Sequence, residues 1–149
     1  MTKVVLLDAG PMGFVTNPKQ SIQGLACSQW VRAMLAAGNR IFVPEIADYE
    51  VRRELIRVNK LAGIAQLDQL ARVTGYLPLT SAAMRQAAVF WAHARQQGRP
   101  TAGDKTIDCD VILAAQAATT NLRGVIIATT NVGHLSQFVP AELWQNITP

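Results

Sequence analysis

Short apolar runs rich in β-branched residues alternate along the chain with longer segments in which apolar positions recur at helical spacing. Apolar runs bounded by turn residues are typical of strands buried on both faces of a parallel sheet. A weaker, edge-like element covers 143–147, and a strand near 76–77 is only weakly indicated because Pro78 follows immediately. The main strands are expected at 4–7, 41–43 and 125–128.

The segments between these runs carry apolar side chains about 3.6 residues apart, which is the period of an amphipathic helix. The first such helix starts at Ile22 and ends near Gly38, since glycine is a common helix stop. Ser81 is the expected cap of a later helix that stops before Gly98. The expected helices cover 22–38, 46–58, 61–70, 81–97 and 108–120.

Strands that alternate with helices favour crossover connections, which produce a parallel sheet covered by helices on both sides. The pattern therefore predicts an α/β fold, a three-layer sandwich around a parallel sheet of roughly five strands. With 149 residues, 50% of them hydrophobic, the chain has enough apolar side chain for one sizeable core. We expect a single domain over residues 1–149.

Composition disfavours several classes of protein. No apolar run approaches the roughly 20 residues of a membrane helix, and the run at 4–7 is shorter than the apolar stretch of a secretory signal. Cys27 and Cys109 match no metal-ligand spacing, so neither a disulfide framework nor a structural zinc site is indicated. We expect a cytoplasmic protein with no membrane partner.

The chain has a formal charge of +4 and a pI near 9.5, a mild bias toward polyanionic partners such as nucleic acids. Because many small proteins are basic, the net charge does not identify the partner. The positions of the 10 acidic residues are more informative. In an open parallel sheet, ligands bind at the carboxyl ends of the strands, and several acids follow the predicted strands.

Asp8 comes directly after the first predicted strand, where a carboxylate needs compensation from a helix N-terminus or a cation. A capping role in the Asp-Ala-Gly-Pro turn explains this aspartate equally well. Glu50 and Glu54 share a face of the helix at 46–58. For Glu54, a surface ion pair with a neighbouring arginine is the better interpretation.

A third group of acids, Asp104, Asp108 and Asp110, lies around the start of the last predicted helix. Residues two apart on a helix do not face each other, so Asp108 and Asp110 cannot both point into one site, and one of them is expected to be a cap. Three acids exceed what capping requires, and a divalent cation would relieve their repulsion. Oxygen ligands of this kind suit Mg²⁺ or Mn²⁺, the ions that handle phosphate esters.

Four segments of the chain together resemble the PIN domain. They are Val5-Leu6-Leu7-Asp8, Ile46-Ala47-Asp48-Tyr49-Glu50-Val51-Arg52-Arg53, Asp110-Val111-Ile112-Leu113-Ala114-Ala115 and Thr129-Thr130-Asn131. The resemblance extends over essentially the whole chain, with the segments in order and at appropriate separations. It implies a Mg²⁺- or Mn²⁺-dependent ribonuclease built on a five-stranded parallel sheet.

Carried over by position, the resemblance makes Asp8, Glu50 and Asp110 the metal-binding and catalytic carboxylates and Asn131 the polar residue that supports them. Asp108 is a further candidate for both roles. Bacterial members of this size include VapC-type toxins of toxin–antitoxin pairs, which typically form dimers and are silenced by a small partner. The implied partners are therefore RNA, a cognate antitoxin and a second copy of the chain.

One position departs from the family pattern. Many members place an acid three residues after the Asn, where this chain has His134. Either the site works with three acids and Asn131, with Asp108 compensating, or its activity is reduced. His134 as a loop residue bonded to the backbone is an equally good interpretation. The alternative function is therefore a catalytically weakened PIN-like module that binds RNA or a protein partner.

Two other phosphate chemistries occur on this fold class. A haloacid-dehalogenase-like phosphatase needs a second aspartate two positions after the first, where this chain has Gly10. A receiver domain needs a lysine at the end of the last strand, and none is evident there. Both are disfavoured.

Overall fold

The computed structural model describes the backbone of residues 2–98 and 104–149 and the side chains of 2–98 and 108–149. Within this part of the chain, the strands form a 5-stranded sheet of order β3-β2-β1-β4-β5. Every neighbouring pair is parallel. The strands are β1 (Val4–Leu7), β2 (Arg40–Pro44), β3 (Gly75–Leu77), β4 (Val125–Thr129) and β5 (Ala141–Leu143).

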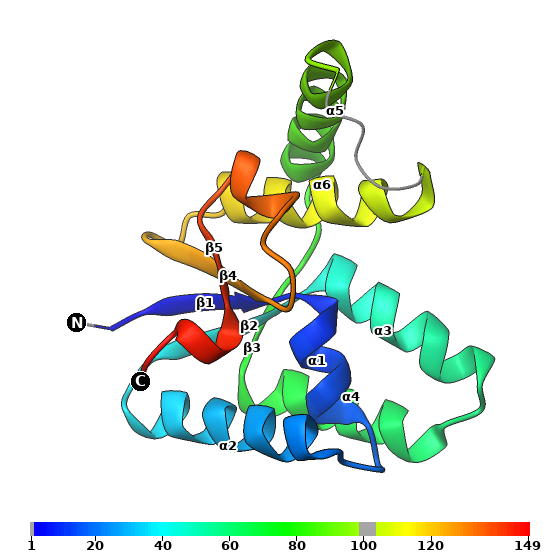
Figure 1. Cartoon of the computed structure of the whole chain (residues 1–149), viewed down its shortest axis with the longest axis vertical. Helices are drawn as coiled ribbons and strands as arrows, with labels where there is room; N and C mark the ends of the chain where they lie inside the picture. The colour runs from blue at the N-terminus through cyan, green and yellow to red at the C-terminus, as the bar shows by residue number, and fades with distance from the viewer. Residues whose placement is uncertain (1, 99–103) are drawn as a thin grey trace.

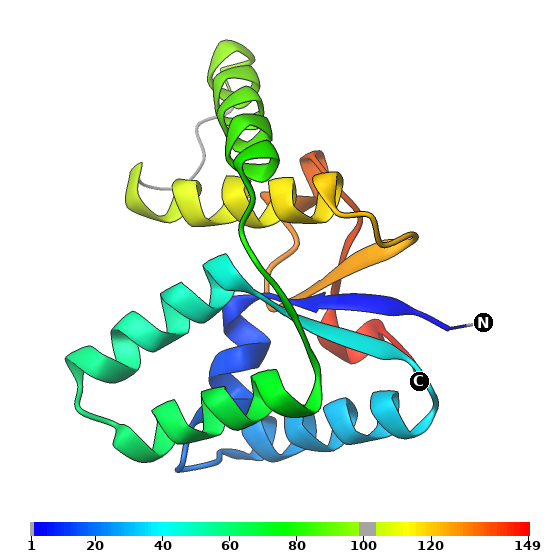
Figure 2. The same ribbon diagram turned by 180° about the vertical axis from the view of Figure 1, so that it is seen from behind.

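Helices cover both faces of the sheet, as Figure 1 shows. Val5 and Leu7 of β1 point into a core formed with α1 to α4, whereas Leu6 points to the opposite core, which contains α6 residues. Helix α5 packs against α6 rather than against the sheet, and it stands away from the other layers in Figure 2. The helices are α1 (Ala9–Thr16), α2 (Ile22–Ala36), α3 (Glu45–Arg57), α4 (Leu61–Val73), α5 (Ser81–Gln96) and α6 (Asp104–Thr119).

The α/β architecture with a parallel five-stranded sheet is the one predicted from the sequence. The weakly indicated strand is real: β3 pairs with β2 at one edge, and Pro78 follows its last residue, where no ladder donor is lost. The last strand was predicted too late in the chain. It is Ala141–Leu143, and the residues after it form the short 3₁₀ helix Trp144–Asn146.

Trp144 and Ile147, which follow β5, are buried because they pack on α2 and not because they extend the sheet. The Trp144 ring lies 5.8 Å from the Trp30 ring, measured between centroids. The indole Nε1 of Trp30 donates a 2.7 Å hydrogen bond to the Ile147 carbonyl. These apolar side chains are therefore buried in a loop. Because strands and loops can both bury apolar side chains, the sequence pattern did not distinguish between them.

Helix α1 was not predicted. The residues Asp8 to Pro11 suggested a turn, but Pro11 lies in the first turn of α1, where its missing N–H has no intrahelical partner to lose. Two other helix starts also differ. The cap of α5 is Thr80, whose hydroxyl accepts a 3.0 Å bond from the Ala83 amide, and α6 begins at Asp104. Neither Asp108 nor Asp110 is therefore a helix cap.

The order of the strands places a crevice beside the central strand. From β1 the chain crosses to β2 on one side, and β4 pairs with β1 on the other, with Leu7 opposite Ala128. The carboxyl ends of β1 and β4 are thus neighbours at the point where the strand order reverses, which is where open parallel sheets bind ligands. No helix among the described residues has the length and apolar character needed to cross a membrane.

Candidate active site

Asp8 is the first residue after β1 and the N-cap of α1, so the capping interpretation is confirmed. Its Oδ1 accepts a 2.7 Å hydrogen bond from the Ala9 amide, and its Oδ2 accepts a 2.7 Å hydrogen bond from the Thr129 hydroxyl. Burial raises the pKa of Asp8, and these two hydrogen bonds oppose the rise. The carboxylate is therefore held in one orientation at the sheet edge.

Glu50 approaches the same region from α3. Burial is the largest cause that raises the pKa of Glu50, and the charges of Asp8 and Asp110 raise it further. Arg53 and the Cys109 thiol, which donates a hydrogen bond to the Glu50 carboxylate, lower it. The pKa of Cys109 itself rises to about 11, because the thiol is buried and lies beside Glu50.

Asp110 completes the group from α6. Burial, followed by the charge of Asp8, raises the pKa of Asp110 to about 6, and His134 opposes the rise. Asp8 therefore raises the pKa of both Glu50 and Asp110, so the three carboxylates face a common region. They come from three separate elements: the end of β1, the middle of α3 and the first half of α6.

Asn131 does not contact this group through any hydrogen bond among the described residues. Its Oδ1 accepts a 3.0 Å bond from the Gly133 amide, which closes a turn within its own loop. The side chain that donates a hydrogen bond to Asp8 is that of Thr129. Thr129 also accepts a 3.1 Å bond from the Asn131 amide, so the Asn131 backbone contacts the residue that supports Asp8. In the sequence, the position of Thr129 at the end of a predicted strand was the feature that could have indicated its contact with Asp8.

Asp108 is not brought to the three carboxylates. It is exposed and lines a hollow between α5 and α6 with Met84 and Trp91. The helical twist accounts for this, because residues two apart lie on different sides of a helix. The prediction for Asp108 is therefore corrected. Asp104 begins α6, and the prediction for its side chain lies outside the described residues.

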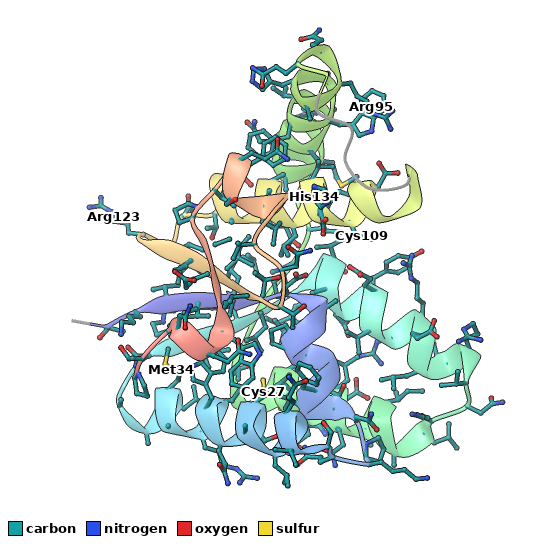
Figure 3. All side chains as sticks on the ribbon, viewed as in Figure 1. Cys27, Met34, Arg95, Cys109, Arg123 and His134 are labelled. Atoms are coloured by element: carbon teal, nitrogen blue, oxygen red, sulfur yellow. The ribbon has the colours of Figure 1, made fainter. Side chains whose placement is uncertain are left out.

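His134 lies close to the acidic group, which its role as a loop residue would not require. Figure 3 places its side chain over α6, near Cys109. Its charge lowers the pKa of Asp110. His134 is followed by the 3₁₀ helix Leu135–Gln137, and its side chain makes no capping hydrogen bond there. The imidazole is thus a neighbour of the Asp110 carboxylate.

The donor chemistry of this group fits Mg²⁺ or Mn²⁺. The charge of Asp8 raises the pKa of Glu50 and of Asp110, and the charge of Asp110 raises that of Glu50, so these carboxylates repel when ionised and a divalent cation would relieve the repulsion. Among the described side chains, however, no three His, Cys, Asp or Glu residues are close enough together to form a metal-binding group as they stand. The carboxylates are thus ligands of the type that these ions prefer, but they lie farther apart than the ligands of a bound metal ion do.

A cleft of about 390 Å³ runs between α1 and α3 and reaches this group at Glu50. Its walls are mainly apolar and include Val51, Leu55 and Val58, with Lys60 at its far end. Of the three carboxylates, Glu50 is the one that lines the cleft.

No protein-family model and no curated protein matches the sequence. Solved structures do match, over nearly the whole chain. A chain of VapBC2 from Rickettsia felis, bound to a DNA fragment from their promoter, has a TM-score of 0.68 at 14% identity, covering 95% of this chain and 98% of that one. For DNA-bound VapBC from Salmonella typhimurium, the TM-score is 0.65 at 20% identity, with 97% and 99% covered.

FitAcB from Neisseria gonorrhoeae gives a TM-score of 0.70 at 16% identity, covering 96% of this chain and 99% of that one. The similarity extends from end to end in all three pairs, so the order and packing of the elements are shared. Identities this low establish likeness of fold. The chain therefore has the PIN-like fold that its sequence resembles.

Proposed function

We propose that this chain is a metal-dependent endoribonuclease that hydrolyses RNA phosphodiester bonds, with Mg²⁺ or Mn²⁺ held by Asp8, Glu50 and Asp110. The observations that support the proposal are the hydrogen bond from Thr129, at the end of β4, to Asp8, directly after β1, and the charge of Asp8, which raises the pKa of both Glu50 and Asp110. A domain that only bound RNA would gain nothing from buried acids next to an anionic ligand. A metal-dependent hydrolase needs them.

The protein's contribution to the reaction is placement. Thr129 and the Ala9 amide fix both oxygens of Asp8, which leaves its remaining lone pairs to face a cation. With a pKa of about 6, Asp110 is ionised at neutral pH and protonated in mild acid. When bound, a divalent cation supplies positive charge that offsets the charge developing on the phosphate in the transition state.

We further propose that the chain is the toxin of a toxin–antitoxin pair, is silenced by a cognate antitoxin and forms a homodimer. The end-to-end likeness to chains of VapBC and FitAcB structures supports this part. The apolar cleft between α1 and α3 offers a place for a segment of such a partner beside Glu50. A short reading frame next to this gene that encodes a DNA-binding protein would support the pairing.

The second candidate is a weakened module that binds RNA or a protein without cleaving it. Two observations favour it: His134 stands where many family members have an acid, and the described side chains form no closed metal-binding group. The hydrolase remains the better-supported function because Asp8, Glu50 and Asp110 are retained together and interact.

A nuclease assay with matched variants tests the two candidates. We expect the purified chain to degrade single-stranded RNA with Mg²⁺ or Mn²⁺ and not in EDTA, and Asp8→Asn to abolish this. The control is Asp68→Asn, the same chemical change at a half-exposed aspartate that pairs with Arg52 on α3. Equal activity of wild type and Asp8→Asn, in preparations free of contaminating nuclease, would reject the hydrolase.

A further inference from the structure

We propose that Tyr49 and Arg53, side by side on α3 next to Glu50, form a subsite for single-stranded RNA, in which the Tyr49 ring stacks on a base and the Arg53 guanidinium binds a backbone phosphate. The inference rests on the proposed function, because it positions the substrate strand beside the three carboxylates. It adds what they lack, which is a group that attracts the RNA.

The two side chains are already arranged as a pair. The Arg53 Cζ lies 5.1 Å from the centroid of the Tyr49 ring, a cation–π contact that restrains both groups. The Tyr49 side chain is nevertheless 54% exposed, so much of the ring remains open to a ligand. An exposed aromatic ring beside an arginine is the arrangement on which proteins stack unpaired bases.

Arg53 also reaches the acidic group. It follows Tyr49 by four residues and Glu50 by three, and both spacings place side chains on the same side of a helix. Its charge acts on Glu50 and on Cys109. An RNA strand that approaches the carboxylates is repelled by them, and a cation at their rim offsets that repulsion.

The neighbouring arginines of α3 are occupied by carboxylates. Arg52 donates a 3.0 Å bond to Asp48 and a 2.7 Å bond to Asp68. Arg57 is paired with Glu54. For Arg53, no carboxylate oxygen of the described residues lies within the 4.0 Å that defines an ion pair. Among the arginines of α3, Arg53 is thus the one that forms no ion pair with a described carboxylate, so its guanidinium can bind a phosphate.

The surroundings of Tyr49 favour RNA over a protein partner. Asp48, the residue before Tyr49, accepts bonds from Arg52 and from the Tyr76 hydroxyl, so this part of α3 carries charged and hydrogen-bonded groups. The centres of protein–protein interfaces are depleted in charged groups. An exposed ring in contact with an arginine instead resembles surfaces that follow a nucleic-acid backbone and stack its bases.

Fluorescence anisotropy with the full chain, in EDTA so that no cleavage occurs, tests the subsite. The probe is a short labelled single-stranded oligoribonucleotide of mixed sequence. We expect Tyr49→Ala to weaken binding about fivefold or more, and Tyr49→Phe to bind like wild type because it keeps the ring. Arg53→Gln should weaken binding and reduce the slope of log Kd against log salt by about 0.7, the value for one phosphate contact on a single strand.

Two controls separate stacking from general charge. Arg57→Gln makes the same charge change on the same helix at an arginine already paired with Glu54, and we expect near wild-type affinity. An oligomer of abasic ribose phosphate should respond to Arg53→Gln but not to Tyr49→Ala. The subsite would be overturned if Tyr49→Ala and Arg53→Gln bound RNA as tightly as wild type does. It would also be overturned if Arg53→Gln and Arg57→Gln lost equal amounts of RNA affinity. If the two variants bind RNA like wild type but no longer bind a protein partner, Tyr49 and Arg53 belong to the interface with that partner instead.

This outcome is separable from that of the hydrolase. If wild type binds the probe through Tyr49 and Arg53 yet cleaves no RNA with Mg²⁺ or Mn²⁺, the subsite stands and the hydrolase fails. If wild type cleaves RNA and both variants keep its affinity and KM, the hydrolase stands and the subsite fails. A wild-type chain that neither binds nor cleaves single-stranded RNA rejects both.

Discussion

The Thr129 hydroxyl donates a 2.7 Å hydrogen bond to Asp8 Oδ2 across 121 positions of sequence. Each residue lies at the carboxyl end of a strand, Asp8 directly after β1 and Thr129 at the end of β4. The parallel pairing of these strands, with Leu7 opposite Ala128, brings the two side chains together. The hydrogen bond favours the ionised carboxylate that a metal site requires.

Replacing Thr129 with Val should lower nuclease activity without a large loss of fold. The variant keeps the branched shape of this buried side chain and removes the donor to Asp8, so the pKa of Asp8 rises further. We expect weaker binding of Mn²⁺ and an acid limb of the pH–activity profile that lies at higher pH. Thr119→Val, which removes a hydroxyl bonded within α6, is the control. Equal effects of the two substitutions on metal binding would contradict the role of Thr129.

The metal-free protein should become less stable as pH rises from about 4 to about 6. The pKa of Asp110 is raised from 3.8 to about 6, so over this range the folded state holds a proton that the unfolded chain has released. The free energy of unfolding therefore falls until Asp110 is ionised in both states. Thermal melting in EDTA across this range checks the sign, and Asp110→Asn should flatten the curve.

Metal should reverse this effect above pH 6. A ligand present at 100 times its Kd stabilises the folded state by about 2.7 kcal/mol. We expect Mn²⁺ to raise the Tm of wild type at pH 7.5 and to have little effect on Asp110→Asn. An equal rise in both proteins would place the metal away from Asp110.

Gly10 is required where α1 begins. A Cβ at this position would lie 2.7 Å from the Thr130 side chain, so the start of α1 and the loop after β4 would have to separate. We expect Gly10→Ala to destabilise the fold by about 1–3 kcal/mol and to reduce activity, because Asp8 lies two residues earlier. Thr130→Gly in the same chain should restore part of the loss.

The matched control for that substitution is Gly13→Ala on the same helix. Nothing lies within 4 Å of a Cβ there, so the change should be neutral or stabilising by about 0.5–1 kcal/mol. Urea unfolding compares the variants. A Gly10→Ala protein as stable as Gly13→Ala would show that the approach to Thr130 is not restrictive.

His134 should affect the pH dependence of activity more than its maximum. Its positive charge lowers the pKa of Asp110, so His134→Ala should raise that pKa and move the acid limb of the kcat/KM profile to higher pH. At high pH, where Asp110 is ionised in both proteins, the two profiles should converge. His93→Ala, an exposed histidine in the last turn of α5, is the control. A uniform loss at every pH would instead identify His134 as a direct ligand or catalytic group.

The local pattern of apolar residues was sufficient to predict the strands that are covered on both faces of the sheet. The continuous apolar runs at β1, β2 and β4 lie in the centre of the sheet, where both faces are covered, and their positions were predictable. The edge strand β5 was misplaced because Trp144 and Ile147 are buried against α2 rather than in a ladder. Helix α1 was missed because it is apolar on every side and has no helical stripe to detect.

For the candidate site, the sequence by itself determined that Asp8 lies at the carboxyl end of a buried strand and that Glu50 and Asp110 lie on helices. Only the tertiary structure decided which acids meet. Asp108 and Asp110 differ by about 200° around the axis of α6, and the packing of that helix on the sheet sets which of them faces Asp8. The pairing of β1 with β4 brings the Thr129 hydroxyl to Asp8, whereas the Asn131 side chain accepts a hydrogen bond within its own loop. The spacing in sequence fixes the angle between two side chains on one helix. Contacts with distant residues decide which face of that helix packs against the sheet.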